Sequence, residues 1–461
     1  MRSGGARSAS RWAAPAPRPR SGAATLPAAP GARRATALAA AALACLALTA
    51  CGTDVDDITQ GPGFGWTAAH NDGRNSGTTA VEGSRQLGPA WQRPLGGPVA
   101  APVTVGSQGQ MFVTTRTANC AIYSFQMSGR KRFCNQLGPN AIAAPTLLDS
   151  ANNVYVGDDS GVNSDNFLGQ PRWRTPVAGV PVTMQFTGDG HVLSITQTGQ
   201  VDVLERQTGK RMVPTAQLLG EPDFLRAPDL TWPAAGQGLD DCATGGPRCA
   251  VSTQAAVDGA SGRIYATVWE PGRPAAALVA LRYTGDRIER LWSAELLTDG
   301  AAAGPTVSAD GGTVYVGDNS GRLLALDTAD GRTRWAHELG WAPRGGLSVD
   351  ADGLLVPAGD DGYLLALRDT GDAVETVWER KDLALRGTPV QTAGGTGYTV
   401  AAIGDGLTLI TFDTETGATV DSDVLTDAQG TTTGTAVGPK GEVVTATRIG
   451  ELFVFTPVSQ G

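Results

Sequence analysis

The chain has 461 residues, of which 41% are hydrophobic and 18% are charged, and its formal net charge is −9. Residues 1–50 hold seven arginines and no acidic residue, which leaves 29 basic against 45 acidic residues in the rest of the chain, a net charge of −16. An acidic surface repels nucleic acid and anionic lipid headgroups, so neither is expected as a partner.

Residues 1–50 have the composition of an export signal. An Arg-rich stretch precedes the apolar run 35–50, which is too short for a membrane span of about 20 residues. The run ends in LTAC at residues 48–51, a pattern typical of bacterial lipoprotein signals. We predict cleavage before Cys51, lipid attachment at Cys51 and a polar tether over residues 51–65. The alternatives are a plain secretory signal with an incidental cysteine, or twin-arginine export through the arginine pair before the apolar run.

Beyond the tether the sequence repeats itself. The clearest copy, residues 312–335, reads as three strands separated by tight turns: Thr313–Gly317, Arg322–Asp327 and a strand that begins at Arg332. A period of about 40 residues with four short strands per copy is typical of propeller blades. The eight copies start near Val99, Ala141, Val180, Val251, Gly300, Pro343, Leu385 and Thr433.

These repeats predict an all-β, eight-bladed β-propeller over residues 66–461, with essentially no helix and no need for a second subunit. A single four-stranded sheet has little core of its own, and stacking sheets around an axis buries both of its faces. The last copy supplies only three strands, while residues 89–93 (PAWQR) read as an outer strand ahead of the first copy. We expect this N-terminal strand to join the last blade and close the ring.

A motif inside the clearest copy carries a family resemblance. Ala325, Asp327, Gly331 and Trp335 follow the docking pattern Ala-x-Asp-(x)3-Gly-(x)3-Trp, and residues 65–77 (GWTAAHNDGRNSG) are similar to the lead-in that precedes the first blade. From residue 66 to the end the chain therefore resembles the quinoprotein-like (PQQ-like) propeller repeat family. With its lipoprotein signal it also resembles the BamB-like lipoproteins of outer-membrane protein assembly. In both cases the docking tryptophans are expected to be structural, wedged against the next blade.

The resemblance implies two classes of function. A BamB-like lipoprotein is a non-catalytic scaffold that binds envelope proteins, and this is the function we expect, on the outer face of the cytoplasmic membrane or at the outer membrane. A PQQ-dependent dehydrogenase holds its quinone over the axis with calcium, a catalytic Asp and commonly a disulfide between adjacent cysteines. This chain has no adjacent cysteine pair, so PQQ and calcium are implied by the resemblance alone and no cofactor is expected. A carbohydrate- or solute-binding propeller is the third alternative.

The residues themselves indicate little chemistry. The three histidines, His70, His191 and His337, show no metal-ligand spacing, and the chain lacks hydrolase, P-loop and zinc-protease motifs. We therefore assign no catalytic, cofactor-binding or metal-binding residue. The aspartate pairs 158–159 and 360–361 fall at predicted hairpin turns, where turn chemistry explains them; calcium binding is the alternative.

Four cysteines follow the signal and the lipidation site: Cys120, Cys134, Cys242 and Cys249. An even number in an oxidising compartment predicts two disulfides, and we pair near neighbours, Cys120 with Cys134 and Cys242 with Cys249. Metal binding is the alternative, against which the spacings and the lack of nearby histidines argue.

Insertions in the repeats predict where a partner binds. Residues 219–250 interrupt the connection between the third and fourth copies, and residues 269–276 and 160–168 are expected to lengthen turns between second and third strands. In antiparallel blades all of these fall on one end of the ring, so we expect them to roof one mouth and carry the partner site. The alternative is a tolerated insertion with no partner. The candidate partner-binding residues are Arg226, Trp232, Asp240, Asp241, Trp269 and Arg273.

Overall fold

The computed structural model describes residues 65–220, 236–252 and 254–458, all of which belong to one compact unit, residues 57–461. In these ranges 33 strands are accompanied by two short helices, the 3₁₀-helix η1 (Pro139–Ala143) and the α-helix α2 (Leu239–Cys242). The fold is therefore all-β, as predicted. In the described ranges no helix has both the length and the apolar character needed to cross a membrane.

Most strands form antiparallel four-stranded sheets whose members follow one another along the chain. The strands of the first three such sheets are β3 (Thr104–Val105), β4 (Met111–Thr114), β5 (Ile122–Phe125) and β6 (Lys131–Asn135); β7 (Leu147–Leu148), β8 (Val154–Asp158), β9 (Gly161–Asp165) and β10 (Pro171–Thr175); β11 (Pro181–Phe186), β12 (Val192–Thr196), β13 (Gln200–Leu204) and β14 (Ala216–Gln217). The next two consist of β15 (Ala256–Asp258), β16 (Arg263–Val268), β17 (Ala276–Tyr283) and β18 (Ile288–Leu297); β19 (Thr306–Val307), β20 (Thr313–Gly317), β21 (Arg322–Asp327) and β22 (Thr333–Glu338).

A nine-stranded sheet follows, made of two meanders and an added strand. The meanders meet where Ala384 and Leu385 pair with Ala402 and Ala401, and β1 (Thr78–Glu82) adds to the inner edge of β27 in parallel. The strands of the meanders are β23 (Gly346–Val349), β24 (Leu354–Ala358), β25 (Tyr363–Asp369) and β26 (Val374–Leu385); β27 (Val390–Ala393), β28 (Thr396–Ile403), β29 (Gly406–Asp413) and β30 (Thr419–Leu425).

The remaining sheet combines strands from the two ends of the described chain. It contains β31 (Thr432–Val437), β32 (Val443–Thr447) and β33 (Glu451–Pro457), and its fourth strand is β2 (Leu87–Pro94). β2 pairs with β33 in antiparallel register, with Trp91 opposite Val454. The segment 89–93 thus supplies an outer strand to the sheet that holds the last repeat.

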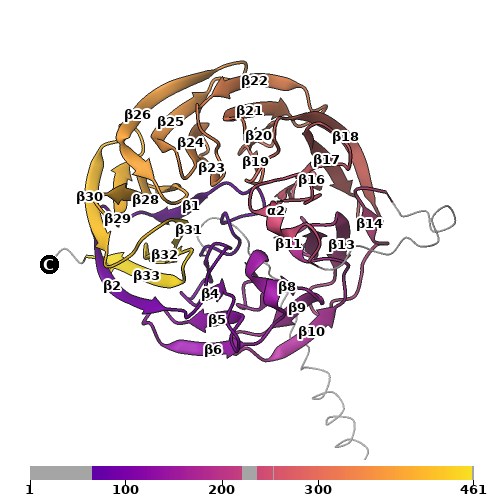
Figure 1. The fold of residues 1–461 in the computed structure, drawn as a ribbon, viewed down its shortest axis with the longest axis horizontal. Coiled ribbons are helices and arrows are strands. Elements are labelled where there is room, and N and C mark those ends of the chain that lie inside the picture. Colours follow the sequence, from indigo (N-terminus) through magenta and orange to yellow (C-terminus); the bar gives the residue numbers. More distant parts are fainter. Residues whose placement is uncertain (1–64, 221–235, 253, 459–461) are drawn as a thin grey trace, which may run out of the picture. The chain divides into compact units, whose positions relative to one another are not determined.

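The sheets stand around a central axis, with the first strand of each meander on the inside and the fourth on the outside (Figure 1). Apolar side chains fill the space between neighbouring sheets. One core cluster joins Val203 of β13 to Val279 of β17, and another joins Leu278 of β17 to Leu324 of β21. Stacking of this kind buries both faces of every sheet, which a lone sheet cannot do.

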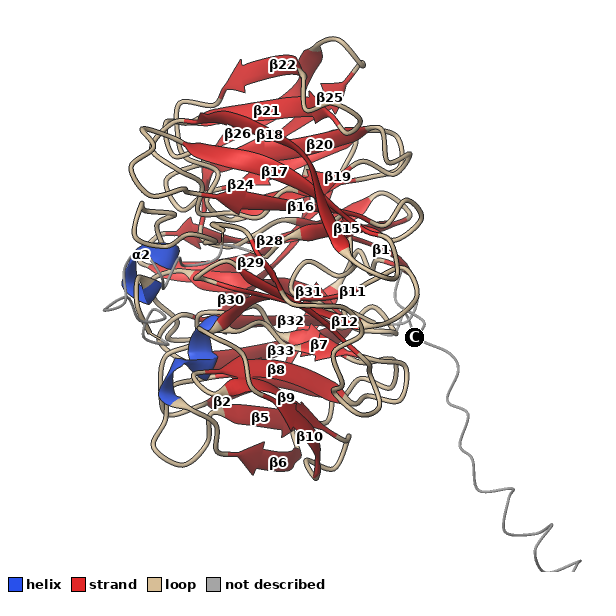
Figure 2. Cartoon of the chain, turned by 90° about the vertical axis from the view of Figure 1, so that its right-hand side faces the viewer, coloured by secondary structure: helices blue, strands red, loops and turns tan. Residues whose placement is uncertain are grey.

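The two ends of the ring differ. One end of the ring carries the connections between sheets and the turns between second and third strands, and we call it the mouth end. Backbone hydrogen bonds tie these two sets of loops together, for example from Gln197 N to Val180 O (3.1 Å) and from Leu339 N to Gly321 O (2.8 Å). Both helices lie on this end, on the left in Figure 2. The turns between third and fourth strands lie on the opposite end.

One predicted insertion is absent. Residues 160–168 were expected to lengthen a turn, but Gly161–Asp165 forms the buried strand β9. The polar sequence GVNSD does not indicate a buried strand. It forms one because its buried polar side chains have hydrogen-bond partners: Arg172 Nη1 donates to Ser164 Oγ (2.9 Å) and Asn135 Nδ2 to Asp165 Oδ2 (2.7 Å). The turn before β9 is short because Asp158 Oδ1 accepts a hydrogen bond from Ser160 N (2.8 Å).

Candidate functional site: the axial cavity

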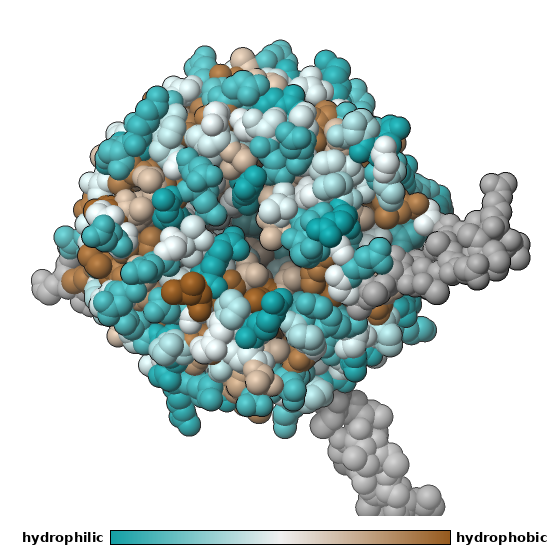
Figure 3. Space-filling view, in the orientation of Figure 1, coloured by the Kyte–Doolittle hydropathy of each residue, from teal (hydrophilic) through white to brown (hydrophobic). Residues whose placement is uncertain are grey.

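A cavity of about 460 Å³ lies on the axis at the mouth end. Figure 3 shows it as a hollow at the centre of this face. Its volume falls in the range of ligand-binding pockets, about 300–1,000 Å³. Most of its wall comes from the connections that precede the inner strands, where small residues leave the space open: Ala101, Ala143, Ala303, Gly345, Thr388 and Thr433.

The floor of the cavity is made by residues 66–77, which we call the axial segment. His70 and its neighbour Ala69 line the cavity. The carbonyl groups of the axial segment accept hydrogen bonds from the inner strands of six meanders. They thereby satisfy N–H groups at the inner edges of the sheets that would otherwise lack a partner. These bonds run from Val105 N to Trp66 O (2.8 Å), Leu148 N to Thr67 O (2.9 Å), Val257 N to Gly73 O (2.5 Å), Val307 N to Arg74 O (3.0 Å), Val349 N to Ser76 O (2.8 Å) and Gln391 N to Gly77 O (3.1 Å).

Asn75 fixes the axial segment from within. Its backbone is left-handed, with φ of 57°, a conformation that Asn tolerates better than most residues. Its buried side chain donates to Pro305 O (2.9 Å) and Gln254 O (3.3 Å) and accepts from Gln185 Nε2 (3.0 Å). The lead-in motif of the sequence is therefore the piece of chain that links the inner strands of several sheets, a role that the sequence alone did not reveal.

The three histidines lie in three different settings. Burial lowers the pKa of His70 to about 4, so its imidazole is neutral at neutral pH and adds no charge to the cavity floor. His191 Nε2 lies 3.7 Å from Asp189 Oδ2, in a turn, and His337 lies on the outer strand β22.

Three exposed arginines line the cavity: Arg116 from the β4–β5 turn, Arg344 from the β22–β23 connection and Arg448 from the β32–β33 turn. Within the described ranges, none of the three forms an ion pair; Arg344 Nε donates to Asn319 Oδ1 (3.2 Å). The carboxylates of the wall are those of Asp240 and Asp360. The arginines are far apart in sequence, and only the arrangement of the sheets around the axis brings them together, so no local motif could have revealed them.

The second wall feature is the loop of residues 236–250, which contributes Asp240 and Cys242 to the cavity. Arg248, which the sequence analysis did not single out, binds both candidate carboxylates: its Nη2 lies 2.9 Å from Asp240 Oδ2 and 2.7 Å from Asp241 Oδ1. The hydrogen bond from Arg248 holds the pKa of Asp241 below its usual range. Arg226 and Trp232, the other two candidates of this insertion, lie outside the described residues.

The loop 269–275 joins β16 to β17, as predicted for the second-to-third strand turn, but it does not reach the axis. Trp269 is only partly exposed, donates its indole N–H to Arg273 O (3.0 Å) and packs against the core. Arg273 forms an ion pair with Glu295 and lines a separate surface depression with Arg290. The structure therefore brings Asp240 and Asp241 to the mouth, and places Trp269 and Arg273 away from the axial cavity.

Two disulfides hold loops of the mouth end. They join Cys120 to Cys134 and Cys242 to Cys249, the pairing expected from their spacing. The first connects the β4–β5 turn, which carries Arg116, to the outer strand β6. The second closes the loop 236–250 next to Asp240.

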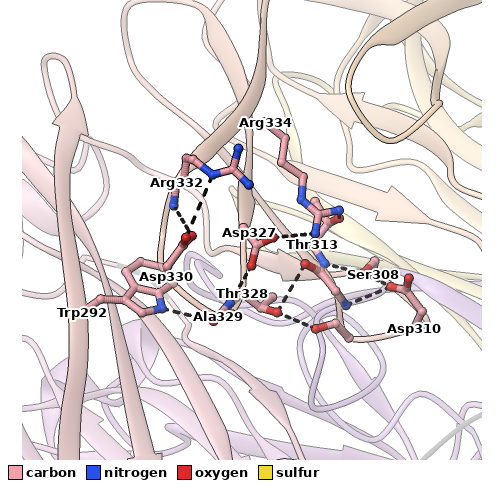
Figure 4. A network of polar contacts seen from close by, with 12 residues as sticks. Trp292, Ser308, Asp310, Thr313, Asp327, Thr328, Ala329, Asp330, Arg332 and Arg334 are labelled. Atoms are coloured by element: carbon pink, nitrogen blue, oxygen red, sulfur yellow. Dashed lines mark hydrogen bonds and ion pairs between the residues drawn. The ribbon is translucent and has the colours of Figure 1, made fainter.

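The docking-motif residues pack neighbouring sheets together, and Figure 4 shows the turn that begins at Asp327 with Trp292 beside it. Trp335 is buried, and its indole N–H donates to Asp369 Oδ1 (2.9 Å) on the next sheet. Asp327 Oδ1 accepts from Ala329 N (2.8 Å) and closes the turn that holds Gly331 against the ring of Trp292. Four other tryptophans donate to a carbonyl of the next sheet in the same way: Trp91 to Met127 (2.7 Å), Trp173 to Arg206 (2.8 Å), Trp292 to Thr328 (3.1 Å) and Trp378 to Thr414 (3.0 Å).

The residues of the cavity do not fit a calcium-assisted quinone site. The described residues of the wall include no Phe, Tyr or Trp and no pair of adjacent cysteines to stack on a quinone. In the described part of the chain, no group of three or more His, Cys, Asp or Glu side chains is placed to hold a metal ion. Of the aspartates at 158–159, Asp158 closes its turn by accepting from Ser160 N (2.8 Å), whereas Asp159 Oδ2 accepts from Asn140 N in η1 (2.9 Å).

Comparisons with known proteins agree on the fold. The family model "Outer membrane protein assembly factor BamB" matches residues 277–457. Among solved structures, BamB from Moraxella catarrhalis has a TM-score of 0.55 at 17% identity and covers 80% of this chain and 100% of that one. Quinohemoprotein alcohol dehydrogenase from Comamonas testosteroni has a TM-score of 0.61 at 14% identity and covers 91% and 84%. Likenesses at such low identity show the fold alone.

Sequence relatives are more informative. BamB of Yersinia pestis is 26% identical over 312 residues, which cover 65% of this chain and 67% of that protein. Protein Rv3035 of Mycobacterium tuberculosis is 35% identical over 417 residues, 88% of this chain and 99% of that protein. The chain therefore belongs, with Protein Rv3035, to the family of BamB-like, PQQ-like β-propellers.

Proposed function

We propose that this protein is an exported, lipid-anchored β-propeller that acts as a non-catalytic scaffold and binds other envelope proteins at its mouth end. The observation that carries the proposal is the axial cavity, whose wall offers three arginines and a disulfide-closed loop. The printed name of the BamB relative, an outer membrane protein assembly factor, supports a role in binding proteins.

We further propose that the ring has eight blades. Six are the four-stranded sheets, and two are the meanders β23–β26 and β27–β30 of the nine-stranded sheet. The pairing of β2 with β33 supports closure of the ring by an N-terminal strand. On this count the propeller spans residues 66–461.

Anchoring rests on the sequence. Cys51 and the tether of residues 51–65 lie almost entirely outside the described residues, and the LTAC pattern at 48–51 supports lipid attachment there. The lipid would hold the propeller at the outer face of the cytoplasmic membrane or at the outer membrane. Stable anchoring takes two membrane-binding signals, which a diacylglyceryl group together with an N-terminal acyl chain supplies.

One observation favours a second candidate function. A cavity of about 460 Å³ is large enough for a small solute, so a solute- or carbohydrate-binding propeller is the alternative. Quinoprotein dehydrogenase activity remains only as an implication of the fold, because the cavity wall does not fit that site.

The two ends of the ring allow a controlled test. A photo-cross-linking amino acid is placed at Asp240 in the mouth or at Asp330 on the opposite end, two aspartates whose side chains are 68% and 62% exposed. In intact cells we expect cross-links from position 240 to a second envelope protein, and none from position 330. Equal labelling from both positions, or no protein adduct from position 240, would overturn the proposal; the latter result would leave the solute-binding alternative.

A further inference from the structure

We infer that the axial cavity receives an acidic, extended segment of the partner protein, whose carboxylates pair with Arg116, Arg344 and Arg448. This inference rests on the proposed scaffold function and adds the chemistry of the partner. It follows from the charge of the cavity, from its shape and from the side chains at its rim.

The cavity is locally basic on an acidic protein. The wall has two carboxylates, and one of them, Asp240, is paired with Arg248 at 2.9 Å. The other, Asp360, is then the one remaining wall carboxylate in the described ranges, while three wall arginines form no ion pair. The chain as a whole carries a net charge of −9. The basic cavity attracts an acidic group, while the acidic surface around it repels the same group.

The shape of the cavity sets how an occupant enters. The axial segment closes the floor, since His70 lines the cavity and its neighbours bind the inner strands. The cavity lies at the mouth end, so an occupant enters from that end. A terminus or an extended loop of a partner that docks on the mouth end meets this requirement, and its carboxylates then reach the arginines.

The rim favours a polypeptide over a small anion. Ile449, next to the cavity-lining Arg448 in the β32–β33 turn, is 61% exposed. Figure 3 shows hydrophobic residues beside the central hollow. Exposed apolar side chains next to a charged cavity fit a segment that carries apolar residues beside its acidic ones.

The loop that presents Arg116 is held in place before anything binds. The Cys120–Cys134 disulfide ties it to β6, and Thr115 Oγ1 donates to Pro98 O (2.9 Å). A preorganised loop loses little conformational freedom on binding, so more of the charge interaction appears as affinity.

Fluorescence anisotropy with purified protein tests the inference. The probe is a short fluorescein-labelled peptide of Asp, Glu, Ser and Ile, and its counterpart carries Lys in place of Asp and Glu. The triple variant Arg116→Gln, Arg344→Gln, Arg448→Gln should weaken binding of the acidic peptide at least about tenfold at low salt. The wild-type affinity should also fall as salt is added, because salt screens charge pairs.

The matched control removes the same number of charges elsewhere. Arg130→Gln, Arg282→Gln and Arg332→Gln alter arginines that do not line the cavity, and this variant should change the affinity less than about twofold. Thermal melts of both variants should match that of the wild type, which excludes loss of fold.

Each other outcome contradicts the inference. If both triple variants lost the same affinity for the acidic peptide, the effect would come from the net charge of the protein. If the wild type bound the lysine peptide as tightly as the acidic peptide, the cavity would not select by charge. Competition by free citrate as strong as that by the acidic peptide would assign the site to a small anion. Because this assay needs neither cells nor anchoring, its failure leaves the cross-linking result at Asp240 to decide the scaffold function separately.

Discussion

Trp335 joins two neighbouring sheets through packing and through one hydrogen bond. It is 6% exposed, contacts the ring of Tyr315 at a centroid distance of 5.9 Å and donates to Asp369 Oδ1 (2.9 Å). Asp369 is held in place because its other oxygen accepts from Tyr315 O–H (2.6 Å). Replacing the indole therefore removes a large apolar contact and one partner of a fixed carboxylate at the same time.

We predict that Trp335→Ala lowers the free energy of unfolding by about 3–5 kcal/mol, the usual cost of deleting a large buried aromatic side chain. Trp335→Phe should lose less, because the ring remains while the N–H donor is gone. Urea unfolding followed by circular dichroism measures both. An unfolding curve of Trp335→Ala that overlays that of the wild type would contradict the docking role of this residue.

At the residue scale, the sequence predicted the role of a residue correctly when that role depends on contacts within its own repeat. The docking motif of Ala325 and Trp335 was readable because strand pairing places these two residues opposite each other. Arg248 was not readable, because its role depends on a disulfide-closed loop that folds it back onto Asp240 and Asp241. Trp269 was read as an exposed partner residue, but it packs under its own loop against Gly300.

At the scale of elements, the repeat pattern predicted the regular strands well, but it did not predict a strand that departs from the pattern. Thr313–Gly317 and Arg322–Asp327 were predicted with the bounds of β20 and β21, since β-branched and apolar residues alternate with turn residues there. β9 was missed because its hydrogen-bonded polar side chains give no such signal. The axial segment was recognised as a lead-in to the first blade, but its role was not predicted, because its bonds to the inner strands use backbone carbonyls, which leave no pattern in the sequence.

The axial segment yields a prediction of its own. Asn75→Ala should lower the free energy of unfolding by about 2–4 kcal/mol, because three hydrogen bonds are lost and alanine disfavours a left-handed backbone. Asn75→Gly keeps the backbone freedom and loses only the hydrogen bonds, so it should cost less. Thermal melts would distinguish the two effects. If Asn75→Ala melted like the wild type, the axial segment would contribute nothing to the stability of the ring.

At the scale of the molecule, the arrangement of the sheets around one axis creates a cavity that no single repeat contains. Arg116, Arg344 and Arg448 lie in three different sheets and meet only because the sheets surround one axis. The sequence predicted the all-β repeat and the mouth-end location of the insertion, because both follow from strand order. It could not predict the basic cavity, since the distance between turns of different sheets depends on how all the sheets are placed around the axis.

The central claim is that a lipid-anchored ring presents its mouth to an envelope partner. It is tested most directly by fractionating cells that carry the cross-linker at Asp240, with Cys51 intact or with Cys51→Ser. We expect membrane-bound protein with a partner adduct when Cys51 is intact, and release from the membranes with a strongly reduced adduct in Cys51→Ser. Cys51→Ser protein that stays with the membranes and keeps its full adduct yield would contradict it.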